Sequence, residues 1–244
     1  MAQARETLCC SLQLRLGPVE QAMEFWWLII LLAFECALLG FLQNSDRCLS
    51  NFHARKICHA GTGMMLLQLD SQDPTARWVV YVFAVVTLLA TWDMIPRLPA
   101  FRFARSNDVG MTAYMCVVMI WFYAGLPIAV VRPMFFADPA GAVVGKYFSG
   151  LKAKGIVNPI WWRTKTTEKS VAGSAAVFLF TVLTFTEPAT LWQRVLVGSL
   201  AVLAEALGGA FDNLLLAATV IGARLAINQA QFGEASLLRG LQQA

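Results

Sequence analysis

Charged side chains inside or beside long apolar segments stand out at five places in this chain, and Glu35 lies in a further apolar segment without a visible partner. Burying a charge in apolar surroundings is costly, so such groups are kept when they are paired or when they do chemistry. The five places lie around Arg55 to His59, at Asp138, along the run from Arg163 to Ser170, at Glu205, and at Asp212 with Asn213.

The first two places combine cations, a histidine and an acid. Arg55 and His59 are four residues apart and therefore share one face of a helix. A basic anchor whose long side chains reach the membrane surface explains Arg55 and Lys56, whereas His59 exceeds what an anchor needs. Small residues after Asp138 are explained by close helix packing, but Asp138 itself is not, so structural and functional readings stand side by side there.

The run from Arg163 to Ser170 alternates cations with hydroxyl groups and leads into an apolar segment that begins VAGSAAVF. Hydroxyls, cations and the free N–H groups of a helix start together form a typical phosphate site. The alternative is a solvated basic loop in which Ser170 is only the N-cap of the helix.

Two further acids flank a Gly-Gly pair near the C-terminus. Glu205 and Asp212 are seven residues apart, with Gly208 and Gly209 between them. Their carboxylates could hold a metal ion through oxygen ligands. Glu205 could equally hydrogen-bond to a neighbouring helix, and Asp212 could be the N-cap of the last helix.

Composition shows which elements must position these groups. Of the 244 residues 58% are hydrophobic and 14% are charged, and the mean hydropathy is +0.59. Soluble domains are about 45–50% apolar and about 25% charged, so we expect an integral membrane protein. The predicted fold is an all-α, polytopic helical bundle of seven or eight transmembrane helices, over the apolar blocks 25–42, 57–69, 78–95, 111–124, 126–145, 171–186, 191–207 and 213–227.

The same blocks predict one transmembrane domain over 23–228, with an N-terminal tail (1–22) and a C-terminal tail (229–244). Gly125–Pro127 divides the long apolar stretch 111–145 into two helices. The basic connectors 43–56, 96–109 and 146–170 then share one face, which the positive-inside rule places in the cytosol or the stroma of a plastid.

Composition also excludes several classes of protein. A net charge of +4 is too mild for a nucleic-acid binder, so no nucleic-acid partner is expected. The six cysteines form no C-x-x-C pair, which argues against a zinc site.

Taken in order, the motifs resemble the CTP-dependent polyprenol kinases, the family of phytol and dolichol kinases, over roughly residues 54–228. Departures from the usual family pattern are Ala137 and Lys169 in place of glycine, and Phe211 in place of an acid. The matching residues are Arg55-Lys56-x-x-His59, Gly110-x-x-x-Tyr114, Asp138-x-x-Gly141-x-x-x-Gly145-Lys146, Lys165-Thr166-x-Glu168-x-Ser170-x-Ala172-Gly173-Ser174, and Glu205 ahead of Asp212-Asn213.

The resemblance implies phosphorylation of a membrane-embedded prenyl alcohol (phytol, geranylgeraniol or a dolichol-type polyprenol) by CTP with Mg²⁺. It implies Mg²⁺ at Asp138 and Asp212, aided by Asn213, and a proton acceptor among these acids or His59. The membrane would be that of the chloroplast or the endoplasmic reticulum, with lipids as neighbours, and the oligomeric state is left open. The implied nucleotide-binding residues are Lys146, Arg163, Lys165, Thr166, Glu168 and Ser170, with Arg55, Lys56 and Glu205 completing the site.

Three alternatives remain. A membrane cytidylyltransferase that makes a CDP-lipid would also use CTP and magnesium, but its C-terminal Lys-Asp and paired-acid signature is not visible. A transporter also uses buried acids and broken helices, but no inverted repeat supports one. The departures from the motifs also leave a scaffold without activity as an interpretation.

Overall fold

The computed structural model describes residues 18–95, 101–164, 167–185 and 189–241, and its α-helices follow the predicted apolar blocks in order. The helices are α2 (Pro18–Asn44), α3 (Asn51–Leu66), α4 (Pro74–Thr91), α5 (Val109–Tyr123), α6 (Arg132–Gly150), α7 (Val171–Thr184), α8 (Leu191–Gly208) and α9 (Asp212–Leu241). Three short 3₁₀ helices are η1 (Ile128–Val131), η2 (Leu151–Lys154) and η3 (Gly209–Phe211), and β1 (Ile160–Arg163) pairs with β2 (Glu168–Ser170) as an antiparallel hairpin. The protein is thus mostly helical, as predicted.

Apolar length supports the prediction of a membrane protein. Four stretches of the described chain are long and apolar enough to cross a membrane: Trp26–Asn44, Pro74–Thr91, Ile128–Lys154 and Leu191–Ala230. The last of these contains α8 and most of α9 with the turn between them. Two more apolar helices, Val109–Tyr123 and Val171–Thr184, are shorter.

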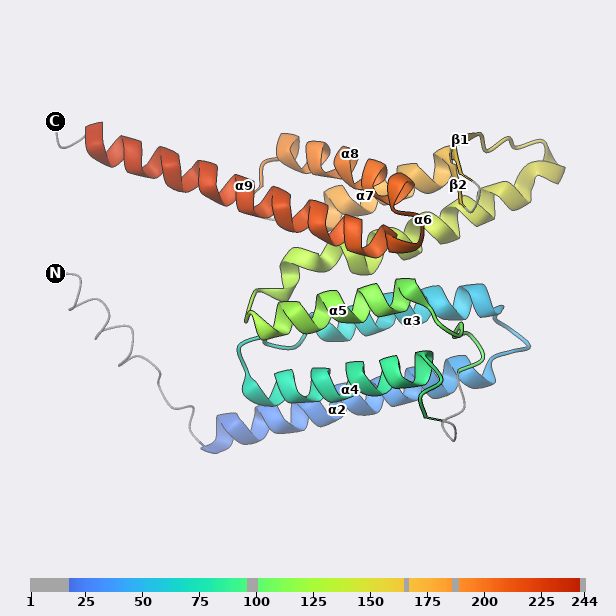
Figure 1. The fold of residues 1–244 in the computed structure, drawn as a ribbon, viewed down its shortest axis with the longest axis horizontal. Coiled ribbons are helices and arrows are strands. Elements are labelled where there is room, and N and C mark those ends of the chain that lie inside the picture. The colour runs from blue at the N-terminus through green and yellow to red at the C-terminus, as the bar shows by residue number, and fades with distance from the viewer. Residues whose placement is uncertain (1–17, 96–100, 165–166, 186–188, 242–244) are drawn as a thin grey trace.

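The helices form two groups, α2–α5 and α6–α9, which lie one above the other in Figure 1. One apolar core joins α3, α4 and α5 to the start of α6, with Phe122 and Phe135 fully buried in it. A second core joins α6, α7, α8 and α9 around Val177 and Leu216. Because α6 contributes to both cores, it connects the two groups.

Local signals explain where the helices begin and end. Asp73, Asp108, Ser170 and Thr190 each accept a hydrogen bond from the first turn of the helix that follows, which satisfies N–H groups that have no partner within the helix. The break predicted at Gly125–Pro127 is confirmed, because α5 ends at Tyr123 and α6 begins at Arg132.

The structure differs from the prediction along the connector 146–170. We expected a polar connector there, but α6 continues to Gly150 and the hairpin of β1 and β2 occupies the second half. Asn158 stabilises this arrangement: its amide donates to the Gly145 carbonyl at 3.2 Å, and its Oδ1 accepts from the Ala172 N–H at 3.1 Å. At the C-terminus, α9 continues beyond residue 228 to Leu241.

Close packing of α6 against α7 brings the hairpin near the middle of α6. A Cβ atom on Gly173 would lie 2.9 Å from the Gly141 carbonyl oxygen, and one on Gly141 would lie 2.4 Å from a Val177 methyl carbon. Only glycine permits this approach of the two backbones. The described parts of all three basic connectors lie at one end of the bundle, the right-hand end in Figure 1.

Candidate active site

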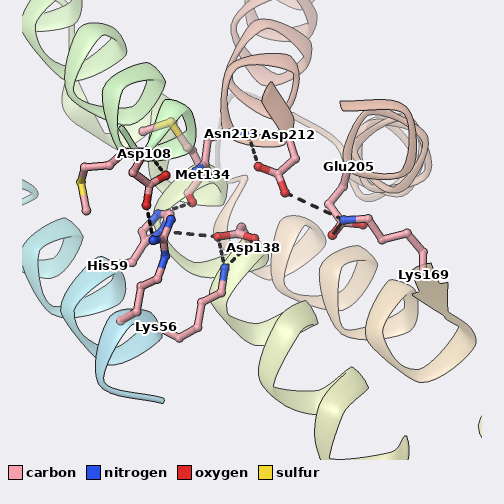
Figure 2. Close-up of polar contacts among 11 residues, drawn as sticks. Lys56, His59, Asp108, Met134, Asp138, Lys169, Glu205, Asp212 and Asn213 are labelled. Carbon is pink, nitrogen blue, oxygen red and sulfur yellow. Dashed lines mark hydrogen bonds and ion pairs between the residues drawn. The ribbon is translucent and has the colours of Figure 1, made fainter. Parts of the chain in front are cut away.

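Five elements from both halves of the chain bring charged side chains to one place (Figure 2). Helix α3 supplies Lys56 and His59, and α6 supplies Asp138. Strand β2 supplies Lys169, the end of α8 supplies Glu205, and the start of α9 supplies Asp212 and Asn213. We call Asp138, Glu205 and Asp212 the acid cluster.

Asp138 is held by two side chains of α3, those of Lys56 and His59. The Lys56 Nζ atom lies 2.8 Å from one carboxylate oxygen of Asp138 and 3.1 Å from the other. His59 Nδ1 lies 3.3 Å from Oδ2 of the same carboxylate. Asp138 is only 4% exposed, so these partners compensate a charge that water does not reach.

The hydrogen bond of His59 Nε2 determines which ring nitrogen of His59 carries the proton. His59 Nε2 is 3.2 Å from the Met134 carbonyl oxygen, which can only accept, so Nε2 donates. In the neutral ring Nδ1 then carries no hydrogen and faces the Asp138 carboxylate. One further proton can therefore lie between Nδ1 and the carboxylate. The Tyr114 ring packs edge-on against His59, with ring centroids 4.6 Å apart, and fixes the plane of the imidazole.

Lys169 contacts the other two acids. Its ammonium group forms an ion pair with Glu205 and lies 3.9 Å from Asp212 Oδ2. The Lys169 side chain is 13% exposed and that of Glu205 is 8% exposed, so this is a buried ion pair that spans 36 residues of sequence.

One ligand oxygen from each of Asp138, Glu205 and Asp212 lies within 4.8 Å of the others. The turn between α8 and α9 makes this possible: Gly209 has φ +55°, a conformation that favours glycine, and it reverses the chain between Glu205 and Asp212. Next to Asp212, the Oδ1 atom of Asn213 is buried and has no hydrogen-bond partner in the described part of the chain. Oxygen ligands of this kind suit Mg²⁺.

Arg55 has a structural partner at the edge of the site. It forms an ion pair with Asp108, which caps α5 and also accepts from the Met111 N–H at 3.1 Å. Burial raises the pKa of Asp108, but the hydrogen bond and charge of Arg55 lower it more, so this pKa lies below the usual range. Arg55 thus ties α3 to the start of α5, two residues ahead of Gly110.

Several residues implied in nucleotide binding lie outside this group of contacts. Arg163 and Glu168 form an exposed ion pair with each other across the hairpin, at 2.9 Å. The Lys146 ammonium lies 4.0 Å from the centre of the Phe52 ring. Ser170 is the N-cap of α7 and accepts from the Gly173 N–H, whereas Lys165 and Thr166 lie outside the described residues.

Sequence reasoning missed two residues of the site. In the sequence, Lys169 stood out only as one of the basic residues of the connector 146–170 and as a departure from the family pattern, and it was assigned no role in the site. Its position one residue before Ser170, the N-cap expected for the helix that begins VAGSAAVF, is the signal in the sequence that could have selected it. Asp108 was missed as well, although an acid two residues ahead of a Gly-x-x-x-Tyr motif at a helix start is visible in the sequence.

No family model, curated protein or solved structure matches this chain. The resemblance to polyprenol kinases therefore depends on the motifs and remains a prediction.

Proposed function

We propose that this protein transfers the terminal phosphoryl group of CTP to a membrane-embedded prenyl alcohol such as phytol, geranylgeraniol or a dolichol-type polyprenol. One observation is the main support for this proposal. The resemblance depends on segments up to 156 residues apart, from Lys56 to Asp212, and polar side chains from several of them (Lys56, His59, Asp138, Glu205 and Asp212) meet in one place. The implied nucleotide-binding residues Lys146, Arg163, Glu168 and Ser170 lie outside it. Buried charges pair in any apolar bundle, so the support lies in the composition of this place, which brings a lysine and a histidine of one motif to three carboxylates of the others.

The donor set fits a magnesium ion. Three carboxylates lie within reach of one ion, and the unpartnered Oδ1 of Asn213 adjoins them. Asp138 and Asp212 would hold the ion, with Glu205 as a third oxygen donor. A magnesium ion bound there would neutralise charge on the nucleotide phosphates, which is the main requirement of phosphoryl transfer.

The protein's own side chains have separate tasks in this reaction. The ammonium groups of Lys56 and Lys169 would attract and orient the phosphates. The alcohol oxygen attacks the γ-phosphorus, the bond from phosphorus to the β,γ-bridging oxygen breaks, and CDP leaves. The alcohol proton passes to the pair of His59 and Asp138, which has room for one proton between Nδ1 and Oδ2.

The surroundings of the site support a lipid substrate. The bundle contains four long apolar stretches and two shorter apolar helices, and we propose that seven or eight helices cross the membrane. The site then lies within the bundle, toward the basic end that faces the cytosol or the stroma. The membrane would be that of the chloroplast or the endoplasmic reticulum.

Lys169 favours one competing function, a scaffold without catalytic activity. Its ammonium group already contacts Glu205 and lies near Asp212, where a divalent cation would otherwise be needed. In such a protein the acid cluster would be balanced by lysines alone and would stabilise the bundle.

A substrate panel tests the proposal. The purified full chain in detergent is incubated with CTP, ATP, UTP or GTP and with phytol, geranylgeraniol or dolichol, and the lipid phosphate is measured. We expect phosphate transfer from CTP, which falls at least about a hundredfold in Asp138→Asn and Asp212→Asn and is unchanged in Lys154→Met, an exposed lysine of η2. No transfer from any nucleotide to any alcohol by folded wild-type protein would favour the scaffold.

A further inference from the structure

A second buried acid lies away from the acid cluster, in a hollow between α2, α3, α4 and α5. The hollow has a cavity volume of about 60 Å³. All the space between its lining atoms, which includes open surroundings, is about 550 Å³. Its wall is apolar except for Glu35 and Thr62, and it includes Leu28, Leu66, Val80, Ala84 and Met115.

Glu35 carries an oxygen atom without a partner. Thr62 Oγ1 donates to Glu35 Oε1 at 2.7 Å, but Glu35 Oε2 is buried and has no hydrogen-bond partner among the described residues. The residue is 6% exposed and belongs to the apolar stretch Trp26–Asn44. An acid inside a membrane span whose hydrogen bonds are incomplete is costly, which points to a ligand that completes them.

We propose that this hollow binds a long-chain alcohol, with the hydroxyl group at Glu35 Oε2 and the chain along the apolar wall. A hydroxyl group both donates and accepts, so it can pair with Glu35 whether the acid is ionised or protonated. A carbonyl can only accept and therefore pairs only with the protonated acid. An ammonium group can only donate and leaves the O–H group of the protonated acid without an acceptor. The hollow is open on part of its surface, so the chain can continue beyond it.

The hollow and the candidate active site share helix α3, and Asp138, Glu205 and Asp212 do not belong to the residues that line the hollow. Thr62 follows His59 by three residues on α3, which is about 4.5 Å along the helix axis. An alcohol bound at Glu35 would therefore lie about one turn of α3 away from His59, and it would not contact the nucleotide there. The choice of an isoprenoid alcohol rests on the proposed function, whereas the binding chemistry needs only a long chain with a hydroxyl group.

Photolabelling without nucleotide tests the inference. The full chain in lipid nanodiscs is labelled with a diazirine derivative of geranylgeraniol, and geranylgeraniol, its hydrocarbon and its primary amine compete. We expect labels on α2–α5 and competition by the alcohol that is about fivefold to tenfold stronger than competition by the hydrocarbon. Glu35→Leu should reduce this preference to less than twofold, whereas Glu35→Gln, which keeps a donor and an acceptor, should retain it.

A matched pair of variants on α4 tests the location. Ala84 lines the hollow and is 2% exposed, whereas Val82 is 59% exposed on the same helix. Ala84→Leu should lower labelling at least about fivefold, and Val82→Leu should leave it unchanged. If Ala84→Leu does not fold, the Glu35 variants alone decide the question.

Three results would overturn the inference: equal competition by alcohol and hydrocarbon in the wild type, stronger competition by the amine, or labels outside α2–α5. Binding of the alcohol at Glu35 without any phosphate transfer would support the alcohol site but contradict the proposed kinase activity. If folded Glu35→Leu transfers phosphate with an unchanged KM for the alcohol, the proposed kinase activity stands, but the hollow is not the site from which the alcohol reacts.

Discussion

Replacing Lys169 by methionine distinguishes an acid cluster that takes a divalent cation from one that a lysine alone neutralises. The Lys169 side chain is 13% exposed, and its partners Glu205 and Asp212 are 8% and 22% exposed. Removing one member of a buried pair leaves an uncompensated charge and costs about 3–5 kcal/mol, whereas an exposed pair contributes about 0–1 kcal/mol. For a chain of this size we expect the apparent Tm of Lys169→Met to fall by roughly 10 °C without divalent cations.

Magnesium should restore much of this loss in Lys169→Met. With the ammonium gone, Glu205 and Asp212 repel each other and Asp138 unless a cation lies between them. Binding to the folded state alone stabilises it by about 2.7 kcal/mol at a concentration 100 times the Kd. The double variant Lys169→Met/Glu205→Gln should lose less stability than the sum of its single variants, because the uncompensated charge is also removed.

The assay is thermal unfolding of the purified protein in detergent, with EDTA or with added Mg²⁺, and Lys154→Met as the exposed control. A Tm of Lys169→Met equal to that of Lys154→Met would show that the ion pair to Glu205 has no part in stability. A large loss that Mg²⁺ does not restore would mean that the acids accept an ammonium group but no metal ion, as expected of a scaffold.

Three further predictions follow from the fold. The lowered pKa of Asp108 means that its pairing stabilises the protein above the usual carboxyl pKa, about 3.9, and that this contribution is lost as the pH falls through the folded-state value. The Tm difference between wild type and Asp108→Asn should therefore shrink as the pH is lowered from about 7 to about 3, and a constant difference would contradict the pairing with Arg55. Gly173→Leu should unfold or strongly destabilise the bundle, because a Cβ there already meets the Gly141 carbonyl at 2.9 Å, whereas Gly150→Ala, with nothing within 4 Å, should keep the wild-type Tm. Cysteines at Asn107 and Ala153 should react with an impermeant maleimide from the same side of sealed vesicles, and reaction from opposite sides would contradict the fold between α5 and α6.

Local sequence signals account for much of this fold. Each predicted apolar block became a helix, because apolar length, caps such as Ser170 and breaks such as Pro127 act within a few residues of chain. The hairpin of β1 and β2 was not predicted, since its register depends on contacts of Asn158 and Trp161 with α6 and α7.

The candidate site was predictable in its residue types but not in its pairings. Asp138, Glu205, Asp212, Lys56 and His59 all stood out as charges in apolar surroundings. Which acid pairs with which base depends on helix packing: Lys56 reaches Asp138 across 82 residues. The role of Lys169 followed only from the approach of β2 to the turn between α8 and α9.

Electron paramagnetic resonance of Mn²⁺ bound to the purified protein with CTP tests most directly whether the acid cluster holds a metal ion and, with it, the nucleotide phosphates. We expect one tightly bound Mn²⁺ per chain with a hyperfine coupling to ³¹P of CTP in the wild type, and a loss of that species in Asp138→Asn and in Asp212→Asn. An identical Mn²⁺ and ³¹P signal in the wild type and in both variants, or no tightly bound Mn²⁺ in the wild type, would contradict the assignment of these acids to phosphoryl transfer.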